Sequence, residues 1–222
     1  MSTVSQPASS EHVEPEPVEP EPEFVADLFG LTIDTARRFT QNLAVRGEEL
    51  GLIGPLELPR LWTRHVANCA LLAPLLSPGR VADVGSGAGL PGIVLALARP
   101  DVEFVLIEPM GRRVQWLISQ VFELGLKNVE VLRARAEEAT NLPAFDQVTA
   151  RAVSALSKLI PITAPLVRSG GELLFLKGAG VGGELEAATK AVEKARLWDV
   201  EILTLGEDYG TETTRVFRAK VD

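Results

Sequence analysis

Glycines recur at alternate positions in the segment Val81–Gly92, which reads Val-Ala-Asp-Val-Gly-Ser-Gly-Ala-Gly-Leu-Pro-Gly. A short β-rich run opens it and the apolar run Ile93–Ala98 follows it, so the pattern predicts a strand, a tight loop and a helix start. Glycines let the backbone approach a ligand closely, and the first turn of a helix has unpaired N–H groups. The segment is therefore predicted to be a nucleotide-binding turn.

Two acidic residues bear on which nucleotide this turn holds. Gly87–Gly92 formally matches the dinucleotide fingerprint G-x-G-x-x-G, and Glu108 follows at the end of the next predicted strand. Asp83 precedes the glycines, however, and an acid is electrostatically unfavourable beside a pyrophosphate. S-adenosylmethionine has no phosphate and carries an α-ammonium that a carboxylate can help to hold. The pattern therefore favours S-adenosylmethionine as the cofactor.

The predicted cofactor contacts come from three consecutive strand ends. Glu108 is placed to accept both ribose hydroxyls, and the backbone at Ala136 and Glu137 is expected to reach the adenine edge. The contacts predicted in the turn itself are Asp83, Gly85, Ser86, Gly87 and Gly89.

The predicted substrate is anionic, because cations gather at the same strand ends. They are Arg112 with Arg113, Arg135, Arg151 and Lys177. The chain lacks the Asn/Asp-Pro-Pro-Tyr motif of enzymes that methylate exocyclic amines after its fourth strand. Its only cysteine, Cys69, is expected to lie far from the cofactor, which argues against a carbon-methylating nucleophile. Arg151 and Lys177, at the mouth, are the predicted catalytic residues.

Charge is distributed unevenly along the 222 residues. The net charge is −8, but residues 1–23 hold six glutamates and no Lys or Arg, which leaves −2 for the remainder. Alternating acid and proline in 14–23 predicts a disordered, acidic, proline-rich tail over 1–23. With no long apolar run and no signal-like N-terminus, we expect a cytoplasmic protein. One cysteine and two histidines predict no metal site.

Two regions follow the tail. Apolar residues at spacings of three and four predict an N-terminal helical subdomain over 24–76. From 77 to 222 strands alternate with helices, which predicts a doubly wound, mostly parallel α/β sheet with one antiparallel strand. We expect strands at 80–84, 103–107, 129–133, 146–150, 172–177, 200–205 and 214–220, and helices at 91–99, 111–124, 155–167 and 184–197.

The helical subdomain contains one histidine of interest. Trp62 and His65 lie three residues apart, on one face of the predicted helix. No second His or Cys has the spacing of a metal site, so we interpret His65 as a partly buried structural histidine. Cys69 follows in an apolar stripe and is expected to pack in the core.

Several strings together resemble the glucose-inhibited division protein B family, the bacterial ribosomal RNA small-subunit methyltransferases G. They are Leu61-Trp62-x-Arg64-His65, Asp83–Gly92, Arg135-Ala136-Glu137-Glu138, Arg151-Ala152 and Leu176-Lys177-Gly178. The resemblance covers roughly residues 24–220. It implies a class I S-adenosylmethionine-dependent methyltransferase fold and methyl transfer to N7 of one guanine in the decoding-site loop of 16S rRNA.

The resemblance also implies roles for single residues. The matching cofactor positions are Gly85, Leu90, Ala136, Glu137 and Arg151. Lys177 is implied as an RNA or base contact, and Arg112 and Arg135 are taken with it as RNA-binding. The expected partner is 16S rRNA or the small ribosomal subunit, bound by a monomer.

Three other functions stay open at this point. The near-neutral charge of residues 24–222 is compatible with a methyltransferase that acts on a small molecule. An NAD-dependent oxidoreductase could use the same fold, but Tyr209, the only tyrosine, has no lysine four residues later. A binding module that has lost catalysis is disfavoured by the intact turn, Glu108 and Arg151.

Overall fold

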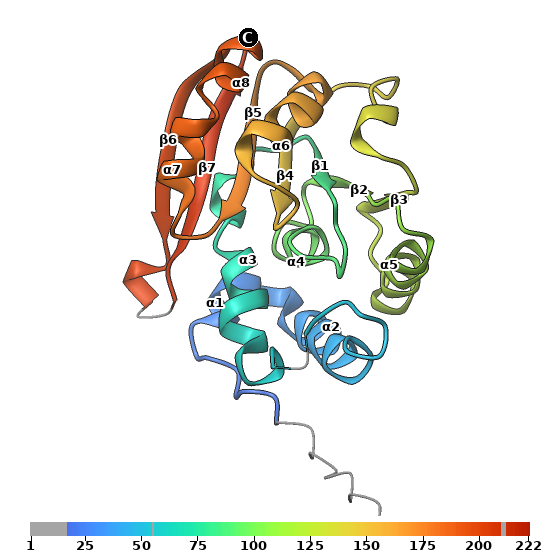
Figure 1. Ribbon diagram of the computed structural model, residues 1–222. Coiled ribbons are helices and arrows are strands. Elements are labelled where there is room, and N and C mark those ends of the chain that lie inside the picture. The colour runs from blue at the N-terminus through green and yellow to red at the C-terminus, as the bar shows by residue number, and fades with distance from the viewer. Residues whose placement is uncertain (1–16, 55, 210–211) are drawn as a thin grey trace, which may run out of the picture.

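The computed structural model describes residues 17–54, 56–209 and 212–222, and it is built on one seven-stranded sheet. The strand order is β3-β2-β1-β4-β5-β7-β6 (Figure 1). All pairs are parallel except those of β7, which runs antiparallel to both neighbours. This confirms the predicted sheet with one antiparallel strand. The strands are β1 Arg80–Val84, β2 Glu103–Ile107, β3 Val129–Leu132, β4 Phe145–Arg151, β5 Val167–Lys177, β6 Leu197–Leu205 and β7 Thr214–Val221.

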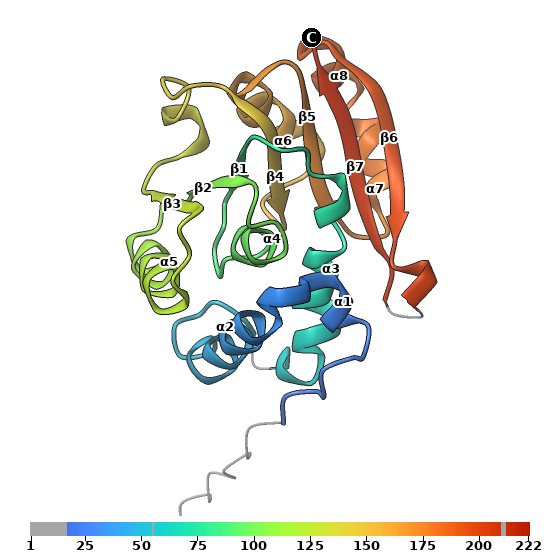
Figure 2. The same cartoon turned by 180° about the vertical axis from the view of Figure 1, so that it is seen from behind.

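Helices cover both faces of the sheet. Helices α6, α7 and α8 pack on one face, and Figure 2 shows α4 and α5 on the other, with α1 and α2 beneath them. The parallel strands point their carboxyl ends toward the layer formed by α1, α2 and α3 (Figure 1). The helices are α1 Val25–Phe29, α2 Ile33–Arg46, α3 Asn68–Ala70, α4 Gly92–Ala98, α5 Gly111–Leu124, α6 Leu156–Thr163, α7 Val181–Ala187 and α8 Thr189–Lys194. Within the residues described, no helix is long and apolar enough to cross a membrane.

Most predicted elements are present, and the differences cluster in the second half. β1, β2 and α5 have the predicted bounds. β5 begins at Val167 instead of residue 172, because its first residue pairs with Phe145 and a register shift then follows, beside Gly170 at φ +75°. The predicted helix 155–167 accordingly ends early, at Thr163, and the predicted helix 184–197 is divided into α7 and α8.

The N-terminal helical region shares its core with the sheet. Phe39 and Leu43 of α2 lie in one buried cluster with Trp116 of α5 and Ile93 of α4. The second predicted helix is irregular: Leu58–Arg60 is a 3₁₀ turn, Leu61–Ala67 is π-helical, and α3 follows. The predicted helical subdomain and the sheet domain are therefore successive in the sequence but share one continuous hydrophobic core.

The predicted tail is only partly within the described residues. Residues 1–16 lie outside them, so disorder there stays a prediction. Residues 17–23 differ from the expectation, because Glu21 forms an ion pair with Arg37 and the Glu19 carboxylate accepts hydrogen bonds from Thr63. These contacts fasten the end of the acidic stretch to α2 and to the π-helical turn.

The Asp83–Gly92 turn is closed by a glycine that has no room for a side chain. Gly92 is the first residue of α4, and a Cβ there would meet the Leu106 side chain and stand 2.6 Å from Asp83 Oδ2. The start of α4 thus rests directly on β1 and β2, as the third glycine of a strand-turn-helix unit requires.

Replacing Gly92 by alanine should therefore destabilise the protein. We expect Gly92→Ala to lower the free energy of unfolding by about 2–3 kcal/mol, because neither Leu106 nor Asp83 can withdraw from the packed core. Gly182→Ala in α7 is the matched control: nothing lies within 4 Å, and alanine should be neutral or stabilise by up to about 1 kcal/mol. Urea unfolding measures both, and equal effects would contradict the packing argument.

Candidate functional site

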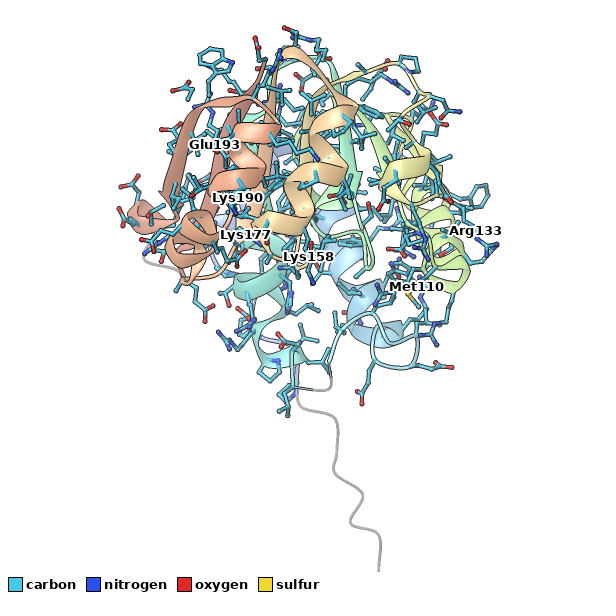
Figure 3. The ribbon with its side chains drawn as sticks, turned by 45° about the horizontal axis from the view of Figure 1, so that its top comes forward. Met110, Arg133, Lys158, Lys177, Lys190 and Glu193 are labelled. Carbon is cyan, nitrogen blue, oxygen red and sulfur yellow. The ribbon has the colours of Figure 1, made fainter. Side chains whose placement is uncertain are left out.

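Two cavities open at the carboxyl ends of the strands, and they share Ala152 and Val153. The first, about 360 Å³, lies over β1, β2 and the segment after β3. The second, about 790 Å³, lies between the ends of β4 and β5 and the residues before α3. Met110 of the first cavity and Lys177 of the second lie on either side of Lys158, in the first turn of α6 (Figure 3). Because Ala152 and Val153, which follow β4, line both cavities, they separate one cavity from the other.

Glu108 is a fixed carboxylate in the wall of the first cavity. It is 2% exposed, and its two oxygens accept the N–H groups of Gly87 at 3.0 Å and Met110 at 2.9 Å. These bonds hold its plane and leave lone pairs for further donors. A diol such as a ribose presents two hydroxyl donors that suit this arrangement, as predicted for Glu108.

The remaining walls of the first cavity are mostly backbone and apolar groups. Ala136 and Glu137, predicted to meet an adenine, line it, and so does Arg135, which was predicted as an RNA contact. Gly85, at φ +71°, forms part of its floor, where a Cβ would stand 2.7 Å from Val153 Cγ2. The site therefore needs glycine at 85 to hold β1 close under Val153.

The structure corrects the expectation from the sequence that the Asp83 carboxylate faces a ligand. It is fully buried, and Oδ2 accepts the Ser86 hydroxyl at 2.6 Å and the Gly92 N–H at 3.0 Å. Oδ1 lies 3.1 Å from the Thr149 hydroxyl of β4. The Ser86 side chain is likewise turned inward, at 1% exposure. Both residues shape the turn from below because their polar atoms are used within it.

The other predicted residues of the turn also lie outside the two cavity walls. The Gly87 N–H is bonded to Glu108, and the Gly89 and Leu90 N–H groups donate to the Ser86 carbonyl. The Leu90 side chain is 5% exposed and packs in the core. Arg112 lies beside Gly51, away from both cavities. The structure therefore brings Gly85, Glu108, Ala136 and Glu137 together around the first cavity. Gly87, Gly89, Leu90 and Arg112 lie outside the walls of both cavities.

Among the described cations that line the second cavity, Arg151 is the one without a carboxylate partner. Its Nη2 lies 2.7 Å from His65 Nδ1, and its Nη1 donates to the Arg64 carbonyl at 3.3 Å. His65 Nε2 lies 2.6 Å from Glu57 Oε2. The sequence predicted only a structural role for His65, because a pairing with a residue 86 positions away leaves no local signal.

Lys177, predicted as a catalytic and RNA-contacting residue, lines the second cavity as part of an ion pair. Its ammonium forms an ion pair with Glu184 Oε2 at 2.7 Å and donates to the Ser154 carbonyl at 2.7 Å, and its side chain is 8% exposed. Glu184 also accepts the Leu156 N–H at the start of α6. Lys177 lines the cavity, but its charge is neutralised and ties β5 to the segment after β4.

Two further residues change the sequence-based picture. Cys69 is fully buried and lies outside the walls of both cavities, and burial raises its thiol pKa to about 11. Its burial, more than its distance, excludes a nucleophilic role. Arg113, predicted only as one of the cations at the strand ends, lines the first cavity and has a buried Nε with no partner among the described residues. Among the described residues, no three His, Cys, Asp or Glu side chains gather as in a metal site.

Comparisons with known proteins agree with this geometry. A family model described as rRNA small subunit methyltransferase G matches residues 32–212. The chain is similar to the ribosomal RNA small subunit methyltransferase G of Clavibacter michiganensis subsp. michiganensis, with 63% identity over 93% of this chain and 99% of that protein. The corresponding protein of Clavibacter sepedonicus is 62% identical over 92% of this chain and 97% of its own length.

Solved structures confirm the predicted fold class. N-methyltransferase NodS from Bradyrhizobium japonicum WM9, in complex with S-adenosyl-L-homocysteine, superposes with a TM-score of 0.55 at 17% identity, over 82% of this chain and 98% of that one. An O-methyltransferase family protein from Burkholderia thailandensis gives a TM-score of 0.56 at 15% identity, over 83% of this chain and 62% of that one. At such identities the likeness concerns the fold alone.

The burial of Asp83 should make stability depend on pH. Burial raises the pKa of its carboxyl from 3.8 to about 6, against the opposing effect of its hydrogen bonds. The folded state therefore holds the proton more tightly, so this contribution to stability is fully present below about pH 3.8 and is lost as pH rises through 6. Relative to Asp83→Asn, the wild-type free energy of unfolding should fall by on the order of 3 kcal/mol from pH 4 to 7.

Asp146→Asn is the matched control for this experiment. The Arg80 N–H and the Arg168 guanidinium lower the pKa of Asp146, so wild-type stability relative to that variant should rise with pH in the acid range. Urea unfolding at several pH values measures both slopes. A pH-independent difference for Asp83→Asn would contradict the buried, ionisable carboxyl.

Proposed function

Since the chain belongs to the rRNA small subunit methyltransferase G family, we propose that it methylates N7 of one guanine in the decoding-site loop of 16S rRNA with S-adenosylmethionine. The observation that carries this proposal is the meeting of two cavities at Ala152 and Val153. One has the fixed carboxylate that a ribose needs, and the other has an uncompensated arginine.

The first cavity fits an adenosine group. Glu108 would hold the ribose hydroxyls, Ala136 and Glu137 the adenine edge, and Gly85 the chain beyond the ribose. The cofactor supplies an electrophilic methyl group on a sulfonium. What this chain supplies is a shaped, largely apolar pocket whose polar groups are already oriented, which favours positioning over chemical activation.

Guanine N7 suits the second cavity because it needs no base. Its in-plane lone pair is free before reaction, so methylation requires orientation and binding of neighbouring phosphates. His65 is the imidazole in the described wall of this cavity, and both of its nitrogens are engaged, with Arg151 and with Glu57. Methylation of an exocyclic amine would need an acceptor for a proton. The carboxylates that line this cavity, Glu57, Glu184 and Glu212, are each already paired with a cation or with His65, which favours N7.

The alternative functions have less support from the contacts in the two cavities. The second cavity, with a volume of about 790 Å³, is also large enough for a small-molecule substrate. An oxidoreductase is disfavoured because Tyr209 stacks on Phe24, with ring centroids 4.9 Å apart, and does not line the first cavity. Action in the cytoplasm follows from an rRNA substrate, and a monomeric state stays a prediction.

Methyl transfer can be tested directly with labelled cofactor. The full chain should transfer label to 16S rRNA or to small ribosomal subunits, and nuclease digestion should recover it as 7-methylguanosine, because the in-plane lone pair of guanine N7 can accept a methyl group without prior loss of a proton. Cell metabolites serve as the parallel sample. Label in metabolites alone would favour the small-molecule reading, and label in another nucleoside would contradict the position.

Arg151 should be indispensable for this reaction. We expect Arg151→Ala to reduce methyl transfer by about 100-fold or more while the thermal unfolding temperature changes little, because its two hydrogen bonds end on neutral acceptors. Lys190→Ala in α8, an exposed cation outside both cavity walls, is the control and should keep full activity. Full activity of Arg151→Ala would remove Arg151 from the site.

A further inference from the structure

The second cavity contains a chain of three polar side chains from two distant parts of the sequence. Glu57 and His65 come from the segment before α3, and Arg151 ends β4. Glu57 Oε2 and His65 Nε2 are 2.6 Å apart, and His65 Nδ1 and Arg151 Nη2 are 2.7 Å apart. The His65 side chain is 11% exposed, so solvent does not replace either contact.

The chemistry of the three groups decides where the protons lie. A guanidinium can only donate, so His65 Nδ1 must accept from Arg151 and is unprotonated. Nε2 then carries the hydrogen and donates it to the Glu57 carboxylate. The imidazole between the two charges is thus neutral, in its Nε2–H form.

Lys177 shows what a direct carboxylate contact does in the same cavity. Its ammonium lies 2.7 Å from Glu184, which neutralises it. Arg151 has no carboxylate within ion-pair distance among the described residues; its partners are His65 and the Arg64 carbonyl. Two of its five donors are used, and the rest, with the full positive charge, are left for a ligand.

We propose that His65, backed by Glu57, is a positioning residue that holds the Arg151 guanidinium for an anionic ligand group without cancelling its charge. The π-helical turn Leu61–Ala67 supports this arrangement by presenting the Arg64 carbonyl and the His65 ring to the same guanidinium. The identity of the anion rests on the proposed function: it is the carboxylate of the cofactor or a phosphate of the RNA.

The arrangement implies a dependence on pH with a defined sign. Protonation of Nδ1 would remove the acceptor and place an imidazolium against Arg151. Burial and the Arg151 charge lower the pKa of His65, Arg64 lowers it further, and the hydrogen bond and charge of Glu57 raise it. Activity should therefore be lost as pH falls through the His65 pKa, and Glu57→Gln should move that loss to lower pH.

The first test separates the two nitrogens of His65. Asparagine can place an oxygen where Nδ1 lies, whereas glutamine can place its amide only where Nε2 lies. We expect His65→Gln to reduce methyl transfer by about 10- to 100-fold and His65→Asn to recover most of that loss and to abolish the acid limb. Equal activities of the two variants, or an acid limb unchanged by Glu57→Gln, would overturn the proposal.

A second test does not depend on catalysis. The chain has two histidines, so a ¹⁵N-labelled His12→Gln variant contains His65 as its single imidazole. Long-range ¹H–¹⁵N correlation at neutral pH should show protonated Nε2 and unprotonated Nδ1, and Arg151→Ala should change this pattern. The opposite tautomer, or an imidazolium, would overturn the proposal, whereas absence of methyl transfer by the wild-type chain would contradict the proposed function alone.

The anion is identified by two ligands, one with and one without the amino-acid part of the cofactor. S-adenosylhomocysteine has the amino-acid carboxylate, and 5′-methylthioadenosine lacks the whole amino-acid part. If Arg151 holds that carboxylate, His65→Gln should weaken binding of the first ligand about tenfold and leave the second unchanged. If it holds a phosphate, both ligands should bind as in wild type and the KM for RNA should rise. Unchanged binding and unchanged KM would overturn the proposal.

Discussion

The buried Asp83 carboxylate is the contact on which the rest of the site depends. It joins the end of β1 to the turn through Ser86, to the start of α4 through Gly92, and to β4 through Thr149. A buried carboxylate is costly unless donors surround it, and these three donors offset that cost in part. Burial still raises the pKa of Asp83 against the effect of these hydrogen bonds, so part of the cost remains. Because β1, α4 and β4 converge on this group, it sets the positions of Gly85 and Arg151, which belong to the two cavities.

Around this hub the two cavities are built on different principles. The first uses an acid, Glu108, whose orientation is set by two backbone N–H groups, and it is otherwise lined by backbone and apolar atoms. The second collects charges of both signs. There Glu184 forms an ion pair with Lys177, while the His65 imidazole lies between Glu57 and Arg151. The chain is acidic overall, so the proposed binding of an anion depends on this local arrangement of charges and not on the net charge.

The N-terminal helices are part of the site as well as of the core. They pack at the carboxyl ends of the strands, where a doubly wound sheet binds its ligands, and they supply Glu57, Arg64 and His65 to the second cavity. Glu19 and Glu21, at the end of the acidic segment, are bonded to the same layer. Residues that precede the sheet in the chain thus form one wall of the second cavity.

Local patterns in the sequence determined much of this architecture. The strand-turn-helix at Val81–Ala98, the bounds of α5, and the placement of Glu108 and Arg151 at strand ends all follow from periodicity and from glycine, which act over a few residues. The tertiary structure alone decided which way polar groups face. Asp83 points into the core, Lys177 is paired with Glu184, and His65 meets Arg151 across 86 positions, because each outcome depends on which elements the sheet order brings together.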